Sequence, residues 1–377
     1  MRPLLPTPRG PLSSALLARL TDGDPLAVPS LRTVDPLTDD DFHLALWCCY
    51  ELHHHGFEGV DDDCEWDLEV LRFRRILESA FEAALRSEHR PSSVPGDPQI
   101  ALRVIATWAG PPLASTVASE GELRHLRELA VHRSAYQLKE ADPHTWAIPR
   151  LSGRGRSAMI EIQTDEYGGG VPGEAHAELF ADAMAQLGLC PEFGHYIDRL
   201  PGATLATDNL VAMFGLNRRL RGALVGHLAL FEMCSVSPMS KYLAATRRVG
   251  GLPALERFYE VHVDADAHHA DLALHQMVDG VVAAEPHLVS DVIFGASALA
   301  RVEARFAQRI LRAWDSGESS LRPTLEGGLG VGDEGAIGEP SNAVDPGPVD
   351  LRVVVPDPSR RHGPSTPGVT GTLPSVS

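Results

Sequence analysis

The eight-residue run HVDADAHH at 262–269 constrains this chain more than any other feature. His262, Asp266 and His269 stand at i, i+4 and i+7, so in an α-helix their side chains lie at roughly 0°, 40° and −20° on one face. Three metal-capable side chains within so narrow an arc can point at one place. Two imidazoles and a carboxylate suit iron with open coordination positions better than a closed zinc site. The alternative is a solvated polar face, since other Asp and His side chains interleave.

Two further segments offer metal-capable side chains. Glu140 stands near the end of an expected helix, just before the stop signal Ala-Asp-Pro at 141–143. Glu166 precedes Tyr-Gly-Gly-Gly-Val-Pro, and His176 follows ten residues after Glu166. In an unbroken helix that spacing would turn the two side chains about 80° apart, whereas a bend at the glycines could aim Glu166 beside His176. Taken alone, Glu140 is more simply explained as a solvated residue at a helix end, and the glycine-rich segment as a connecting loop. The interpretation as a metal site therefore depends on the joint occurrence of these segments with the run at 262–269.

Composition narrows the function class. The chain has 377 residues, of which 44% are hydrophobic, so most of it is expected to be globular. A formal charge of −18 argues against a nucleic-acid partner and against an anionic membrane surface. No uninterrupted apolar run approaches the roughly 18 residues of a membrane span. Five scattered cysteines without a C-x-x-C pair predict reduced thiols and a cytoplasmic location.

The pattern along the chain predicts an all-α protein. Residues 1–30 are Pro- and Leu-rich and are expected to form a disordered tail, as is the Gly-, Pro- and Ser-rich stretch 317–377. Between them we expect a helical extension over 31–115 and a helical core over 116–316. Helical spacing, with Asp39 or Asp40 as the first cap, predicts helices over about 39–52, 67–86, 121–140, 174–187, 205–234, 255–285 and 287–314.

The motifs together resemble a known family. YQLKEADPH (136–144), DEYGGGVPGEAH (165–176), HVDADAHH (262–269) and GALVGHLALFE (222–232) look like the haem-oxygenase-like di-iron oxidases and oxygenases, often called iron-containing redox enzymes. The resemblance covers about residues 40–316. It implies a haem-oxygenase-like helical bundle that binds two Fe(II) ions and uses O₂ as co-substrate. It further implies N-oxygenation, oxidative C–C cleavage or decarboxylation, usually of amino acids or fatty acids.

The resemblance also implies a ligand set. Glu140, His176 and His269 are expected to hold one iron, and Glu166, His262 and Asp266 the other. Many family members carry another acidic ligand three residues before the histidine, where this chain has Gly173. Glu174 is the nearest substitute, if an irregular turn lets it reach in. Three carboxylates against two Fe(II) ions leave about +1, which favours a carboxylate-bearing substrate and predicts weaker iron binding than a four-carboxylate site.

Four more residues are candidate extra ligands or neighbours of the ligands. One is Glu174, next to Gly173, and another is Tyr167, which directly follows an expected ligand. His227 and Glu232 lie in an otherwise apolar helix, where polar groups need partners. Each could contact the substrate or a ligand, or simply form a structural hydrogen bond.

The sequence therefore predicts a non-haem di-iron oxidase or oxygenase of a small metabolite. Two rivals stay open: a non-catalytic helical protein that binds a small molecule, and a mononuclear iron enzyme using His262, Asp266 and His269. No dinucleotide fingerprint or Fe–S cysteine cluster is present, so electrons are expected to come from the substrate or an external reductant. A homodimer is left open.

Overall fold

The computed structural model describes residues 2–89, 96–108 and 110–323, all within the first of two units, Met1–Leu325 and Glu326–Ser377. The described residues form helices and no strands, which confirms the all-α prediction. The longer helices are α1 (Pro11–Asp22), α2 (Asp40–Glu51), α3 (Leu68–Glu88), α4 (Pro98–Ala106), α5 (Leu113–Glu120), α6 (Leu123–Gln137), α8 (Gly153–Glu166), α9 (His176–Gln186), α10 (Gly202–Leu216), α11 (Arg221–Val249), α12 (Pro253–Leu272) and α14 (Val289–Asp315). The short helices are α7 (Asp142–Thr145), α13 (Asp279–Ala284), η1 (Asp62–Trp66), η3 (Ile148–Arg150), η4 (Gly168–Gly170), η5 (Ile197–Arg199), η6 (Arg218–Leu220), the π-helix η7 (Ala273–Val278) and η8 (Pro286–Leu288).

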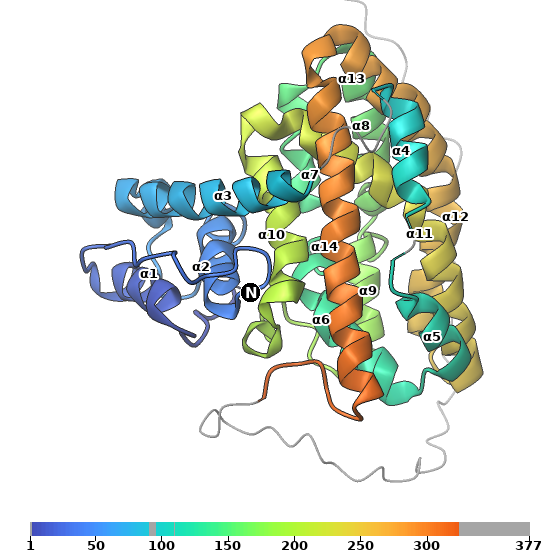
Figure 1. Ribbon diagram of the computed structural model, residues 1–377. Helices are drawn as coiled ribbons and strands as arrows, with labels where there is room; N and C mark the ends of the chain where they lie inside the picture. The colour runs from blue at the N-terminus through green and yellow to red at the C-terminus, as the bar shows by residue number, and fades with distance from the viewer. Residues whose placement is uncertain (1, 90–95, 109, 324–377) are drawn as a thin grey trace, which may run out of the picture. The chain divides into compact units, whose positions relative to one another are not determined.

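Helix α11 is the central element of the bundle, and it packs along both α12 and α14 (Figure 1). It ends at Gly250, whose φ of 79° is readily adopted by glycine, and α12 begins with Pro253 at its first turn. The short connection makes α11 and α12 an antiparallel pair. Helix α9 packs on α12, and α8 packs on η7, so the helices that carry the candidate ligands surround α12.

Two glycines allow α11 and α14 to approach closely. A Cβ added to Gly226 on α11 would lie 1.8 Å from the carbonyl oxygen of Val292, and one added to Gly295 on α14 would lie 1.9 Å from that of Ala223. Any larger side chain would force the helices apart. Gly226, within the segment 222–232, and Gly295 therefore set how closely α11 packs against α14.

Residues 1–30 differ from the predicted disordered tail. Residues 11–22 form α1, and Leu12, Leu16 and Leu20 are buried in the core. The cap of α1 comes from another helix, because the Asp41 carboxylate accepts from the backbone N–H groups of Leu12 (2.8 Å) and Ser13 (2.8 Å). A cap supplied by a tertiary contact leaves no signal in the local sequence, whereas the proline at the first helical position is itself compatible with a helix.

Most predicted helices are present, with changes at their ends. The side chains of Asp39 and Asp67 cap α2 and α3, respectively. The sequence pattern predicted the cap of α2. The predicted helix over 205–234 is instead two helices that meet at Asn217, whose side-chain amide donates to Met213 and to Glu78. The predicted boundary between 115 and 116 falls inside α5, and α4 and α5 both pack on α11. Most of the predicted tail 317–377 lies outside the described residues.

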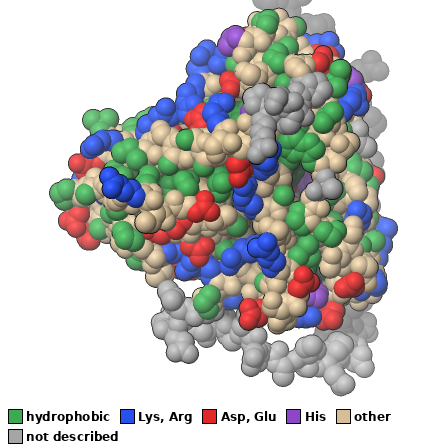
Figure 2. Space-filling model, viewed as in Figure 1, with side chains coloured by type: hydrophobic (Ala, Val, Ile, Leu, Met, Phe, Trp, Pro, Cys, Tyr) green, Lys and Arg blue, Asp and Glu red, His purple; other side chains and the backbone are tan. Residues whose placement is uncertain are grey.

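Helix α11 has a further property of its length and composition. Within the described part of the chain, residues 218–249 form the single helix long and apolar enough to cross a membrane, with a mean hydropathy of 1.2 in its most apolar window. That window is 67% buried inside the bundle, and a buried core helix passes the same test. Both signs of charge are distributed over the face shown in Figure 2.

Candidate metal centre

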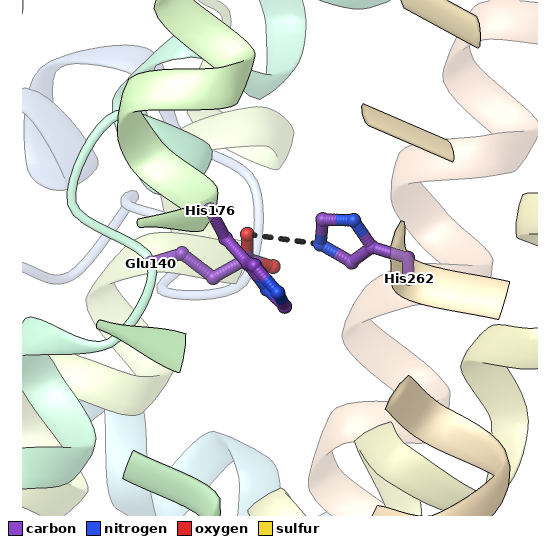
Figure 3. A group of neighbouring side chains, drawn as sticks. All are labelled: Glu140, His176 and His262. Atoms are coloured by element: carbon purple, nitrogen blue, oxygen red, sulfur yellow. Dashed lines mark hydrogen bonds and ion pairs between the residues drawn. The ribbon is translucent and has the colours of Figure 1, made fainter. Parts of the chain in front are cut away.

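Glu140, His176 and His262 come together from three parts of the chain (Figure 3). Glu140 lies in the turn after α6, His176 is the first residue of α9, and His262 is in the middle of α12. The two imidazole ring centroids are 4.2 Å apart, and His262 Nε2 lies 3.4 Å from Glu140 Oε2. All three side chains are buried, and one donor atom from each lies within 4.8 Å of the others. This group has the donor types and the spacing to hold one metal ion.

A second group contains Glu166, Glu232, Asp266 and His269. Glu166 ends α8, Glu232 lies on α11, and the other two lie on α12. His269 Nδ1 is 3.5 Å from Glu232 Oε2 and 3.7 Å from Glu166 Oε1. The group is buried, and Glu166 also reaches the first group, with its Oε2 2.9 Å from His176 Nδ1. Glu166 therefore lies between two neighbouring groups that could each hold an ion.

The observed grouping differs from the predicted partition. His262 joins Glu140 and His176, while His269 joins Glu166 and Asp266. The prediction also assigned the two histidines of α12 to different ions, but it exchanged them. His262 and His269 are separated by two turns, or about 10.5 Å along the axis, and the axial position of α12 relative to its neighbours decides which of them lies beside Glu140 and His176. The helical angles predict that the three α12 residues share a face, but they do not predict this axial position.

The glycine-rich segment bends the chain as the sequence suggested. Gly168, Gly169 and Gly170 all have positive φ, at 63°, 62° and 77°. A Cβ on Gly168 would lie 2.4 Å from the backbone of Glu174, so the turn folds tightly back on itself. Glycine is needed there both for conformation and for space. The turn brings the end of α8 to the start of α9, which confirms that a bend aims Glu166 beside His176.

Hydrogen bonds fix which nitrogen of two histidines faces the centre. His262 Nδ1 lies 2.7 Å from the carbonyl oxygen of Phe258, to which it donates, so Nε2 is the nitrogen that faces Glu140. His269 Nε2 lies 3.0 Å from Asp165 Oδ2, and donation there leaves Nδ1 facing Glu166 and Glu232. Such outer partners orient metal-binding imidazoles in many proteins. When the inward nitrogens lose their protons, both rings would present a lone pair to the interior.

Several buried polar atoms at the centre lack a hydrogen-bond partner within the described structure. They are Glu140 Oε1, Asp266 Oδ2 and the Nδ1 atoms of His176 and His269, which lie 2.9 Å and 3.5 Å from carboxylate oxygens of Glu166 and Glu232 without hydrogen-bond geometry. Buried polar atoms are nearly always satisfied, so four such atoms at one place need an explanation. Each is a lone-pair donor that a metal ion would accept. The residues present therefore fit the iron that the sequence resemblance implies.

The charge distribution leads to the same conclusion. In the described part of the chain, no Lys or Arg side chain forms an ion pair with Glu140, Glu166, Glu232 or Asp266. Burial raises the pKa of Glu232 to about 8 and that of Asp266 to about 6, with the nearby carboxylates adding to both shifts. Without metal, Glu232 and Asp266 therefore hold protons to a higher pH than ordinary carboxyl groups do, and a bound cation would displace those protons.

The histidines respond in the opposite sense. Burial alone would lower the pKa of His262, but its contact with Glu140 outweighs burial and raises the pKa to about 10. In the same way Glu232 and Asp165 raise the pKa of His269 to about 9 against the effect of burial. Burial raises the pKa of Glu166, and the neighbouring histidines reverse that and lower it. The protons that a metal must displace therefore reside on His262, His269 and Glu232 at pH 7.

Glu232 changes the charge count made from sequence. With it, four carboxylates carry −4, which two Fe(II) ions would neutralise. The expected charge of +1 at the centre, the preference for an anionic substrate and the expectation of weak iron binding all assumed three carboxylates, so they lose their basis. Glu232 was considered from sequence only as an extra ligand or neighbour, and its signal was a carboxylate in an otherwise apolar helix.

The other candidate residues occupy different positions. Glu174 is half-exposed and pairs with Arg257 at 2.7 Å and 2.8 Å, so it does not reach the centre as a substitute ligand. The Tyr167 hydroxyl donates to Asp142 Oδ1 at 2.7 Å, on the helix that follows Glu140. His227 is buried, and its Nδ1 lies 3.2 Å from His144 Nε2. His144 lines the small cavity at the centre, so His227 contacts the site through it.

A larger cavity adjoins this centre. Its volume is about 350 Å³, and its lining is mainly apolar and aromatic. Tyr136 and Phe231 line both this cavity and the small cavity at the metal-capable side chains, with ring centroids 5.6 Å apart. One ion pair, between Arg133 and Glu303 at 2.7 Å and 2.9 Å, also faces the large cavity. A small apolar molecule held there would lie next to the candidate metals.

A second buried charged cluster lies on the other side of Glu140. Lys139 is buried and its Nζ lies 3.0 Å from Glu51 Oε2 and 3.1 Å from Asp208 Oδ2. Burial opposes ionisation of Glu51, but Lys139 and His55 outweigh it and lower the pKa of Glu51 to about 2. The sequence patterns gave Lys139 no role. Consecutive residues of one turn thus point into two different charged clusters.

Comparison with known proteins agrees with this site. Residues 127–304 match the family model described as iron-containing redox enzyme, and this segment includes all seven metal-capable residues above. A nitrosourea synthase from Streptomyces achromogenes subsp. streptozoticus is 26% identical over 147 residues, which cover 39% of this chain. The match spans 31% of that enzyme's length. The family resemblance stated from the sequence motifs is thereby confirmed.

Proposed function

Because residues 127–304 belong to the iron-containing redox enzyme family, we propose that this protein is a non-haem di-iron oxidase or oxygenase that uses O₂ to oxidise a small metabolite. The observation that carries the proposal is the pair of adjacent buried groups, with three and four metal-capable side chains, inside the family segment. A protein that only bound a small molecule would gain nothing from burying four carboxylates without cations. A mononuclear enzyme would leave one group unexplained.

We assign one ion to Glu140, His176 and His262, and the other to Glu166, Glu232, Asp266 and His269. Two Fe(II) ions held there would supply electrons for the reduction of O₂. The chain's own residues assemble the ions, hold the imidazoles in the metal-binding tautomer through Phe258 and Asp165, and bury the centre away from bulk water.

The large cavity is proposed to hold the substrate. Its lining favours an apolar body, and its volume of about 350 Å³ suits a small metabolite. Amino-acid-like and fatty-acid-like molecules, the classes that the resemblance implies, stay in the proposal. Oxidation at nitrogen is the first outcome to test, because the chain is similar to a nitrosourea synthase and a nitrosourea contains a nitrogen–oxygen bond. C–C cleavage and decarboxylation are the alternatives.

The test is O₂ consumption by protein loaded anaerobically with Fe(II), with and without a panel of amino acids and fatty acids. We expect one compound class to accelerate O₂ consumption. Ala300→Trp, which fills the large cavity from α14, should remove the acceleration while iron still binds. Loss of iron in this variant would indicate a misfolded bundle, whereas unchanged acceleration would place the substrate elsewhere.

Acceleration that survives removal of Glu232 and His269 together would contradict the di-iron assignment, and it would equally contradict the mononuclear rival, which uses His269. The external reductant, a homodimer and a cytoplasmic location stay predictions, as does the absence of nucleic-acid and membrane partners.

A further inference from the structure

The loop between α9 and η5 carries three metal-capable side chains that are separate from the centre described above. They are Cys190, Glu192 and His195, within the six-residue stretch CPEFGH. Their donor atoms, a thiol sulfur, a carboxylate oxygen and an imidazole nitrogen, all lie within 4.8 Å of one another. Cys190 is half-buried, and the other two side chains are exposed. Side chains so close in sequence can converge only if the backbone turns between them.

The backbone of this loop makes that turn and is held in place. Gly194 has a φ of 80°, which lets the chain reverse between Glu192 and His195, and the N–H of His195 donates to the carbonyl oxygen of Glu192 at 3.2 Å. The N–H of Cys190 donates to the hydroxyl oxygen of Tyr196 at 2.9 Å, which ties the first residue of the stretch to the residue just after it. The three donors are therefore arranged before any ion arrives.

The donor set specifies the kind of ion. One thiolate and one carboxylate carry −2 together with a neutral imidazole, which balances a divalent cation. Within the described residues, no Lys or Arg pairs with Glu192 in place of such an ion. Sulfur, nitrogen and oxygen ligands together are typical of Zn²⁺, whereas the all-nitrogen-and-oxygen set of the buried centre suits iron. Three protein ligands also leave a fourth position for water.

An ion bound at this loop would also fix the residue on the inner side of the loop. Phe193, between the ligands, packs against Trp47 with ring centroids 6.1 Å apart and against His55 at 4.8 Å. The Lys139 ammonium lies 5.3 Å from the centroid of the Phe193 ring. We propose that Cys190, Glu192 and His195 bind a Zn²⁺ ion, which clamps the loop so that Phe193 covers the buried Lys139 cluster beside Glu140.

Cobalt(II) is the probe that tests this site separately from the iron centre. Chelator-treated full-length protein is titrated with Co²⁺ anaerobically under a metal-free reductant, and the near-ultraviolet absorption is followed. A thiolate bound to Co²⁺ gives an intense charge-transfer band there, and the seven residues of the buried centre include no sulfur ligand. The result therefore does not depend on the proposed oxidase function.

We expect the band to reach the intensity of one thiolate-bound Co²⁺ per chain, whatever further Co²⁺ the buried centre takes up, and to disappear when Zn²⁺ is added. Cys190→Ser should abolish it, while Cys64→Ser, at another half-buried cysteine, should leave it unchanged. His195→Ala should weaken Co²⁺ binding by more than the roughly 10–100-fold that loss of an outer partner costs. Absence of the band in the unmodified protein, its persistence in Cys190→Ser, or its resistance to Zn²⁺ would overturn the proposal. Far-ultraviolet circular dichroism confirms that each variant is folded.

Discussion

Two buried charged clusters lie on either side of one turn, and they differ in where their positive charge comes from. Lys139 supplies a permanent cation to Glu51 and Asp208. The next residue, Glu140, points into a centre with four carboxylates and three histidines and without a lysine or arginine partner among the described residues. The first cluster draws its cation from the chain itself, whereas the second is balanced only by protons or by bound cations. This difference separates a structural charge cluster from a candidate metal centre.

The largest expected effect comes from removing a ligand. His269→Ala should reduce O₂ consumption to background and lower the iron content, because the second group loses its only imidazole. His268→Ala is the matched control. His268 lies next to His269 on α12, and its exposed ring faces Glu161 of α8. Iron content and O₂ uptake are measured on both. Equal losses in the two variants would mean that α12 as a whole, and not the centre, is being disturbed.

Removing the cation of the Lys139 cluster should act on stability. Lys139→Met leaves Asp208 buried without a cation and Glu51 with His55 alone, which should cost about 3–5 kcal/mol of the free energy of unfolding. Lys241→Met, which loses only a surface contact to Ser115, should change it by no more than about 0.5 kcal/mol. Urea denaturation of metal-free protein measures both. A small effect at Lys139 would show that water reaches the cluster.

The two clusters should respond differently to pH. In metal-free protein, the raised pKa of Glu232 (about 8), His269 (about 9) and His262 (about 10) means that the folded state holds more protons than the unfolded state at neutral pH. Stability should therefore fall as pH rises from about 7 to 9, by up to roughly 1.4 kcal/mol per pH unit for each group that titrates.

Iron reverses this trend, because metal binding needs the deprotonated forms. Iron affinity should keep rising well above pH 6.5, the limit expected from an unperturbed histidine. Glu51, whose pKa is about 2, contributes nothing to stability changes in this range. Thermal unfolding of metal-free and iron-loaded protein between pH 6 and 9 tests both statements, and parallel curves for the two forms would contradict them.

A smaller effect is expected from the outer partner of His269. Asp165→Asn keeps an acceptor but removes the charge that favours the Nε2–H tautomer, so iron affinity should fall by about 10–100-fold. Competition with a coloured chelator measures the change. An affinity equal to that of the unmodified protein would show that the ring is held by packing alone.

The smallest effect is expected at Glu174. Glu174→Gln removes only a half-exposed ion pair with Arg257, so stability should change by about 1 kcal/mol or less. Iron content should be the same as in the unmodified protein. A loss of iron in this variant would mean that Glu174 reaches the centre after all, as the sequence had allowed.

The sequence predicted the fold class and most of the candidate centre because both leave periodic signals. Helical spacing revealed the face of α12, and the glycine run revealed the turn that joins Glu166 to His176. Glu232 was underestimated because a single carboxylate in an apolar helix says that a partner exists but not which one. The grouping of the ligands, the cap of α1 by Asp41 and the burial of Lys139 all depend on distances between helices, which no local pattern contains.

The most direct test of the di-iron account is to count the iron. Protein is treated with a chelator, loaded anaerobically with ⁵⁷Fe(II), freed of excess metal and examined by Mössbauer spectroscopy alongside a protein assay. The account predicts two Fe(II) ions per chain in two distinct environments, one with two histidines and one carboxylate and the other with one histidine and three carboxylates. A single iron per chain, or none, would contradict it.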